Sequence, residues 1–211
     1  MDEDRFIGRE IAGYHVEELL GRGGMGIVYR AEHVRLGRRV AFKVVAPEIS
    51  NDPRFRERFL RESRTAGSID HPNVVPIYDA GEADGVLYMA MRLVEGTDLG
   101  TLIEREGRLE PGRVGSLIAQ IAAALDAAHE AGLVHRDVKP SNVLIPAGGG
   151  RREHAYLGDF GLTKRLTSQS GVTASAAFLG TIAYVAPEQI EGRPVDARAD
   201  QYSLPASRSN A

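Results

Sequence analysis

The chain has 211 residues, a formal net charge of −3 and no cysteine. This length suits one large domain or two small ones, and the lack of cysteine excludes a disulfide framework, a cysteine-based zinc site and thiol catalysis. The slightly acidic balance argues against a general binder of nucleic acids or membrane surfaces. No apolar run approaches the roughly 20 residues of a membrane span and the N-terminus is not signal-like, so we expect a cytoplasmic protein.

The first distinctive feature is a glycine-rich stretch, residues 21–26, with Gly21, Gly23 and Gly26. It follows the segment 14–20, in which Val, Tyr and Leu are mixed with polar residues. The residues that follow it are β-branched and aromatic, which favours a second strand and a hairpin over the helix of a dinucleotide-binding unit. Glycines without a Cβ let a hairpin lay backbone N–H groups over phosphates. Taken alone, the stretch fits an ordinary flexible turn equally well.

The next strand predicted, Val40–Val45, carries Lys43 on the face opposite Val40, Phe42 and Val44. A helix after it has a stripe of residues at helical spacing, namely Phe55, Phe59, Glu62, Ala66 and Ile69. A lysine and a glutamate that both face the interior are each costly alone and tolerable as a pair. The pattern therefore predicts an ion pair between Lys43 and Glu62.

Further along the chain, two strands are predicted at 74–78 and 86–94, separated by a turn at 81–85. Gly96 breaks the strand pattern and predicts a boundary between a strand-rich and a helical lobe. Pro111 opens a helix that ends at Ala131-Gly132 and has an apolar side typical of a structural element.

The polar residues with chemical potential gather in the loop 135–142, His-Arg-Asp-Val-Lys-Pro-Ser-Asn, and in the triplet 159–161, Asp-Phe-Gly. The apolar residues 133–134 and 143–145 on either side of the loop predict short strands that hold it.

Four side chains in these segments suit the binding of a metal-chelated phosphate. Asp159 and Asn142 offer hard oxygen ligands for Mg²⁺, and Lys139 offers a positive charge. Asp137 can accept a proton from a hydroxyl group. Either segment alone would be explained as well by a solvated polar loop.

As an ordered set with Ala186-Pro187-Glu188, these motifs resemble the signature of the protein kinases. Lys139, two residues after Asp137, resembles the serine/threonine branch, and the local sequence is similar to bacterial eukaryotic-like (Hanks-type) serine/threonine kinases. The resemblance implies an α+β, bilobal protein-kinase-like fold with ATP in the cleft between the lobes. It places a tail at 1–13, a small antiparallel-sheet N-lobe with one helix at 14–94, and a mainly helical C-lobe at 95–204.

The resemblance also implies roles for individual residues in transfer of the ATP γ-phosphoryl group to Ser or Thr hydroxyls of proteins. Asp137 would accept the hydroxyl proton, Asn142 and Asp159 would hold Mg²⁺ or Mn²⁺, and Lys43 and Lys139 would offset phosphate charge. His135 is expected to be a buried structural residue rather than a base. The resemblance also implies a nucleotide-binding set, which comprises Gly21, Gly23, Gly26, Val28, Ala41, Lys43, Met91, Leu93 and Leu144.

The segment 162–184 is rich in Ser, Thr, Gly and Ala and resembles a kinase activation segment. A phosphate added at Thr173 or Ser175, by autophosphorylation, would bind Arg136 through charge-assisted hydrogen bonds. The alternative interpretation is an ordinary mobile loop.

The resemblance stops near the C-terminus. Residues 200–204 resemble the start of a long central helix of the C-lobe, but Pro205 is expected to break it and 205–211 to form an off-pattern tail. We therefore expect a C-lobe that is incomplete, through truncation or a frameshift. The alternatives are an inactive kinase remnant or a nucleotide-binding module, and a dinucleotide oxidoreductase is disfavoured by the strand after the glycines. The resemblance also allows a dimer through the N-lobe.

Overall fold

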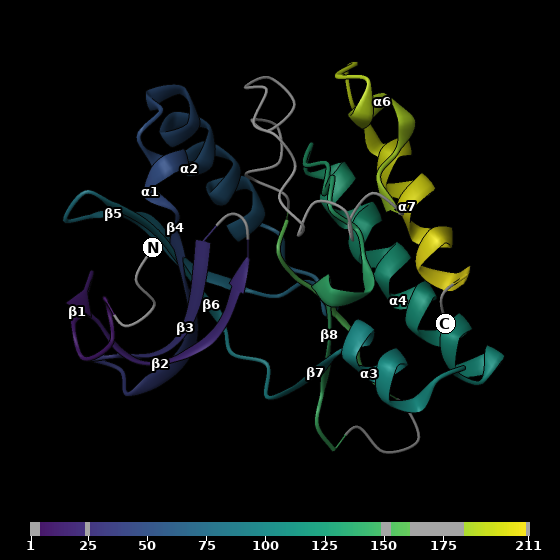
Figure 1. Cartoon of the computed structure of the whole chain (residues 1–211), viewed down its shortest axis with the longest axis horizontal. Coiled ribbons are helices and arrows are strands. Elements are labelled where there is room, and N and C mark those ends of the chain that lie inside the picture. Colours follow the sequence, from purple (N-terminus) through teal and green to yellow (C-terminus); the bar gives the residue numbers. More distant parts are fainter. Residues whose placement is uncertain (1–4, 24–25, 149–152, 161–183, 210–211) are drawn as a thin grey trace. The chain divides into compact units, whose positions relative to one another are not determined.

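The computed structural model describes residues 5–23, 26–148, 153–160 and 184–209. By its internal contacts the chain forms two compact units: Met1–Ser68 with Pro76–Leu93, here the first unit, and Ile69–Val75 with Val94–Ala211, the second unit. The first is built mainly from strands and the second mainly from helices (Figure 1).

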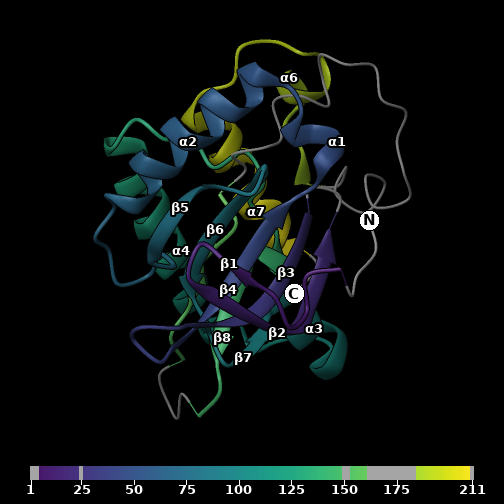
Figure 2. The same cartoon turned by 90° about the vertical axis from the view of Figure 1, so that its left-hand side faces the viewer.

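The first unit contains a six-stranded antiparallel sheet in the order β1-β2-β3-β4-β6-β5. Helix α2 packs against β5 (Figure 2). The predicted glycine hairpin is confirmed, since β2 and β3 pair antiparallel as far as Gly23 opposite Gly26. The elements of this unit are β1 (Glu10–Ile11), β2 (Tyr14–Gly23), β3 (Gly26–His33), β4 (Arg38–Val45), α1 (Pro47–Ser50), α2 (Pro53–Gly67), β5 (Ile77–Ala83) and β6 (Val86–Arg92).

One hydrophobic cluster of the first unit lies on the face of this sheet that carries Phe42. Val40, Phe42 and Val44 of β4 are at most 1% exposed, as the alternation in the sequence predicted. The Phe42 ring stacks on Tyr88 at 5.3 Å between centroids and lies 5.3 Å from Tyr14. Aromatic and β-branched side chains thus fill this side of the sheet.

Helix α2 begins where Asp52 accepts a hydrogen bond from the Arg54 N–H at 2.9 Å, an N-cap that the sequence of a helix start predicts. The predicted stripe is partly wrong. Ser63, eight residues after Phe55, takes the buried position, whereas Glu62 is only half-buried. Ile69 lies beyond the end of the helix at Gly67.

The strand predicted at 74–78 is wrong for residues 74–76. Val74 forms a parallel bridge with Leu157 in the second unit, and the Val75 N–H bonds to the Leu157 carbonyl at 2.9 Å. Pro76 has no N–H to continue this pairing, and β5 starts only at Ile77. The turn between β5 and β6 is Asp84-Gly85, not 81–85, and both of its residues have positive φ, the type I′ geometry that Asp-Gly favours.

The second unit combines a small antiparallel sheet, in the order β7-β8-β9, with helices. Gly96 is required there because a Cβ at this position would lie 2.1 Å from the Ile145 carbonyl oxygen. Its elements are β7 (Gly96–Asp98), α3 (Leu99–Glu106), α4 (Pro111–Glu130), the 3₁₀ helix η1 (Pro140–Asn142), β8 (Val143–Pro146), β9 (Tyr156–Leu157), α6 (Pro187–Ile190) and α7 (Ala197–Ser209).

Helix α4 follows the prediction from Pro111 to its glycine end. Gly132 has φ +76°, its N–H bonds to the His129 carbonyl, and the Leu133 N–H bonds to the Ala128 carbonyl at 2.8 Å. This is a Schellman motif. Because it occupies Leu133, the strand predicted at 133–134 does not form.

Helix α7 packs against α4 (Figure 1). The expected break at Pro205 is wrong, because α7 continues from Ala197 to Ser209. Proline removes only the bond to the carbonyl of Gln201, an exposed residue whose carbonyl water can satisfy. Within the described ranges, no helix is both long and apolar enough to cross a bilayer.

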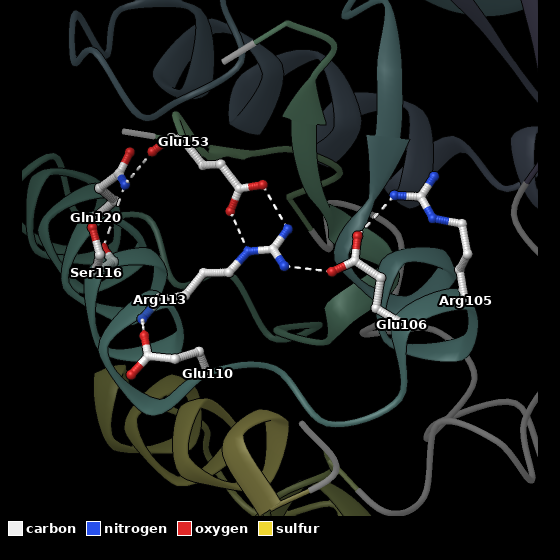
Figure 3. Close-up of polar contacts among 7 residues, drawn as sticks. All are labelled: Arg105, Glu106, Glu110, Arg113, Ser116, Gln120 and Glu153. Carbon is white, nitrogen blue, oxygen red and sulfur yellow. Dashed lines mark hydrogen bonds and ion pairs between the residues drawn. The ribbon is translucent and has the colours of Figure 1, made fainter. Parts of the chain in front are cut away.

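A polar network joins α3, α4 and the chain before β9 (Figure 3). The Arg113 guanidinium forms two parallel bonds of 2.6 Å to Glu153 and one of 2.5 Å to Glu106. These contacts lower the pKa of Glu106, chiefly through its hydrogen bond with Arg113. Gln120 donates to the Glu153 carbonyl and accepts from the Ala155 N–H. The network holds the start of β9 on helix α4.

Candidate functional site

Four residues of the predicted nucleotide-binding set share one face of the first unit's sheet. Val28 lies opposite Lys43, and Ala41 lies opposite Met91. Directly opposed residues of antiparallel strands project to the same side, as do residues two apart on one strand. Val28, Ala41, Lys43 and Met91 therefore face together, away from the core around Phe42.

The three glycines of the hairpin have different structural explanations. Gly26 has φ +151° and a Cβ there would lie 2.0 Å from the Val44 carbonyl oxygen, so the fold itself requires glycine. Among the described residues, no heavy atom lies within 4 Å of a Cβ built on Gly21 or Gly23. Packing among the described residues thus does not explain those two glycines, whereas close approach of a ligand would. Leu93, the last residue of the first unit's 76–93 segment, is half-buried.

Lys43 and Glu62 are both half-buried within the first unit. One carboxylate oxygen of Glu62 is shielded from solvent, and a shielded carboxylate needs a compensating cation or donor. The ion pair between them stays a prediction.

The second unit brings Asp137, Lys139 and Asn142 together. The Asn142 Nδ2 donates to the Asp137 carbonyl oxygen at 2.7 Å and to Asp137 Oδ2 at 3.2 Å. The Lys139 Nζ lies 3.0 Å from the same Oδ2. The 3₁₀ turn Pro140–Asn142 folds the loop back so that residues two and five positions after Asp137 reach its carboxylate.

His135, two residues before Asp137, is fully buried and holds the loop 135–142 through its ring nitrogens. Its Nδ1 accepts from the Asp137 N–H at 3.2 Å, and its Nε2 bonds to the Gly158 carbonyl at 3.0 Å. Since a carbonyl accepts only, the proton sits on Nε2 of a neutral ring. Burial lowers the pKa of His135. The expectation of a buried structural histidine is confirmed.

Asp200 of helix α7 anchors the same loop and was not predicted. Its Oδ1 accepts from the Arg136 N–H at 2.7 Å, and its Oδ2 accepts from the His135 N–H at 2.8 Å and lies 2.8 Å from His129 Nε2. The residue has no exposed surface. Its neighbours on the same helix, Ala199 and Ser203, are buried as well.

Gln189 of α6 is a second residue that sequence reasoning missed. Its Nε2 donates to the Arg136 carbonyl oxygen at 2.9 Å, and its Oε1 accepts from the Ala186 N–H at 3.2 Å. The triplet 186–188 thus leads into a helix whose third residue contacts the loop 135–142.

Asp159 lies two residues beyond β9, which pairs with β8, the strand that follows Asn142. The Gly158 N–H donates to the Asn142 carbonyl oxygen at 2.9 Å, so the residue before Asp159 is hydrogen-bonded to Asn142. Asp159 is exposed, with φ +53°, and the next residue, Phe160, is buried against the His135 ring.

Asn142 and Asp159 carry the amide and carboxylate oxygens that Mg²⁺ takes as ligands. Because Nδ2 of Asn142 bonds to Asp137, its Oδ1 faces elsewhere, and Asp159 adds a carboxylate. In the part of the chain that the structure describes, no three His, Asp or Glu residues form a metal cage, so further ligands would come from phosphate and water, as is usual for Mg²⁺.

Leu144, half-buried on β8, pairs with Asp98 and Tyr156. Thr173 and Ser175 lie outside the described residues.

Comparison with known proteins gives consistent matches. The serine/threonine-protein kinase PknH of Mycobacterium tuberculosis (strain H37Rv) is 48% identical over 202 residues, 96% of this chain and 32% of the relative. PknD of the same strain is 46% identical over 198 residues, 94% of this chain and 29% of the relative. The chain thus spans about a third of the length of these curated relatives.

A crystal structure of the M. tuberculosis PknI kinase domain matches with a TM-score of 0.76 and 38% identity, over 95% of this chain and 74% of that chain. The expected kinase-like fold, with its antiparallel sheet and helical part, is confirmed. The protein kinase domain family matches residues 14–207, which is most of the sequence. On these grounds the chain belongs to the protein kinase domain family.

Proposed function

We propose that this chain phosphorylates Ser and Thr hydroxyls of proteins with ATP. The observation that carries the proposal is the cluster in which Lys139 and Asn142 both bond to Asp137 Oδ2. A carboxylate held by two donors keeps a fixed direction, which is what a group that positions a hydroxyl and accepts its proton needs. The matching relatives are named serine/threonine-protein kinases.

The first unit supplies the nucleotide contacts in this proposal. Lys43 pairs with ATP phosphates and is oriented by Glu62, while Gly21 and Gly23 allow backbone N–H groups close to the phosphates. Ala41 and Met91, side by side on neighbouring strands, provide an apolar surface for the adenine. The shared face of these residues supports this assignment.

The second unit supplies the groups that act on the transferred phosphoryl. Asn142 and Asp159 hold Mg²⁺, which when bound neutralises charge that develops on the phosphate oxygens. Lys139 offsets the same charge and lies 3.0 Å from Asp137 Oδ2. Asp137 orients the acceptor hydroxyl and takes its proton. Phosphorylation of Thr173 or Ser175 by the chain itself is part of the proposal.

The experiment is a transfer assay with labelled ATP and Mg²⁺ on the purified chain, with itself and a Ser/Thr peptide library as acceptors. We expect label on Ser or Thr, with Thr173 and Ser175 identified by mass spectrometry. Asp137→Asn keeps the shape but not the basicity, and should lower kcat by about 100-fold or more. Nucleotide binding without transfer in the wild type would instead indicate an inactive nucleotide-binding module.

We also propose that the domain works in the cytoplasm, where ATP is supplied, and self-associates through the first unit. Supporting the second point, Val34 and Leu36, in the turn between β3 and β4, are 51% and 70% exposed. A cluster of exposed apolar side chains is one mark of a protein–protein contact.

A further inference from the structure

Gln189 fixes the peptide bond that immediately precedes Asp137. The carbonyl of this peptide belongs to Arg136 and accepts from Gln189 Nε2 at 2.9 Å. Its N–H belongs to Asp137 and donates to His135 Nδ1 at 3.2 Å. Hydrogen bonds at both ends of one planar peptide prevent its rotation, so the direction in which the Asp137 Cα–Cβ bond leaves the backbone is set from both sides.

The backbone here needs such restraint. Arg136 has φ +64°, a left-handed conformation that is unfavourable for a non-glycine residue. Its own N–H is held by Asp200 Oδ1 at 2.7 Å. The unfavourable conformation therefore persists because side chains from α7 and α6 hold the two sides of the residue.

The amide of Gln189 is suited to this task because it uses both of its ends. Nε2 donates to Arg136, while Oε1 accepts from the Ala186 N–H at 3.2 Å. A glutamate would keep the acceptor and lose the donor, and would set a carboxylate oxygen against the Arg136 carbonyl. An alanine would leave the carbonyl without this donor.

We propose that Gln189 is a positioning residue for phosphoryl transfer, acting through the Arg136–Asp137 peptide on the orientation of the Asp137 carboxylate. This inference rests on the proposed function. Loss of the bond frees the peptide to rotate and misaligns the carboxylate relative to Lys139 and Asn142. Because misplacement by about 1 Å can reduce a rate 100-fold, kcat should fall roughly 10- to 100-fold. The KM for ATP should stay within about twofold, since the proposed nucleotide contacts of the first unit are not altered.

The test compares Gln189→Glu and Gln189→Ala with the control Glu191→Gln. Glu191 is an exposed residue just after α6 whose carboxylate contacts Arg193. Each protein is measured for kcat, KM for ATP, thermal midpoint, and amide hydrogen exchange of the peptide spanning 133–139. We expect a lower kcat, an unchanged KM and midpoint, and faster exchange in 133–139 for both Gln189 variants, with the control like wild type.

Two results would overturn the inference. One is wild-type kcat in both Gln189 variants. The other is a fall in kcat that accompanies a lower midpoint and faster exchange throughout the second unit, which would indicate a general structural role. If the wild type itself transfers no phosphate, the proposed function fails, and the exchange measurement alone decides whether Gln189 holds the loop: selective acceleration in 133–139 supports it and unchanged exchange refutes it.

Discussion

His135 links the buried interior of the second unit to the loop that carries Asp137, and it does so as a neutral ring. Burial lowers its pKa in the folded state, against the opposing effect of the nearby Asp200 carboxylate. In the unfolded chain it titrates near the usual value of about 6.5. Below that pH the unfolded state binds a proton that the folded state does not, so folding stability falls as the pH drops through 6.5.

We therefore predict that part of the acid sensitivity of this chain comes from His135. Between pH 7.5 and 5.5 the free energy of unfolding of the wild type should decrease by about 1 kcal/mol more than that of His135→Gln, in which the amide can still donate to the Gly158 carbonyl. Urea titrations at both pH values measure this difference. Parallel pH profiles for the two proteins would show that His135 does not titrate differently on unfolding.

At this scale the sequence predicted the cluster around Asp137 but not the residues that hold its loop. Asp137, Lys139 and Asn142 lie within six residues, so their clustering follows from a local turn and could be predicted. Asp200 and Gln189 act on backbone atoms of Arg136 from 64 and 53 positions away. A backbone N–H or carbonyl imposes no pattern on the sequence of its distant partner, which is why neither residue was found.

Individual elements followed the sequence where local chemistry decides, and departed from it where a distant partner does. Pro111 and Gly132 marked the ends of α4 because N1 proline and C′ glycine act within one turn. By contrast, Val74 and Val75 have strand-forming side chains but pair with Leu157 rather than with the first unit's sheet. Strand partners depend on tertiary context, which overrides β-propensity.

The polar network of Figure 3 gives a prediction about how elements are joined. Arg113 forms a forked pair with Glu153 and a further bond to Glu106. Arg113→Lys keeps the charge but cannot make the two parallel bonds, so the free energy of unfolding should fall by about 1 kcal/mol. Urea denaturation measures the change.

Arg105 provides the matched control, because it contacts Glu106 in the same network (Figure 3) but is 63% exposed. Arg105→Lys should change stability by less than about 0.5 kcal/mol, as expected for an exposed ion pair. Equal losses for the two variants would mean that the fork at Arg113 has no special weight.

For the whole molecule, the sequence indicated a strand-rich and a helical part, with a boundary near Gly96. The contacts divide the chain between Leu93 and Val94, and additionally assign 69–75 to the second unit. Asn73 explains the second division, since its Nδ2 donates to the Ala155 carbonyl at 2.8 Å and to Gln120 Oε1 at 2.9 Å. Together with the bonds of Val74 and Val75 to Leu157, these two bonds tie the segment to the second unit, and no periodicity in the sequence signals them.

The proposed self-association is a property of the molecule's surface, and one exposed leucine tests it. Leu36 is 70% exposed in the turn between β3 and β4. If this turn lies in a contact between two copies, Leu36→Glu buries a charge there and should weaken association by at least about tenfold. Ile190→Glu is the matched control, because Ile190 is 64% exposed on the second unit. Sedimentation equilibrium gives the dissociation constants. A wild type that remains monomeric at every concentration refutes the proposed dimer. If the two variants weaken association equally, the dimer does not form through the turn that carries Leu36.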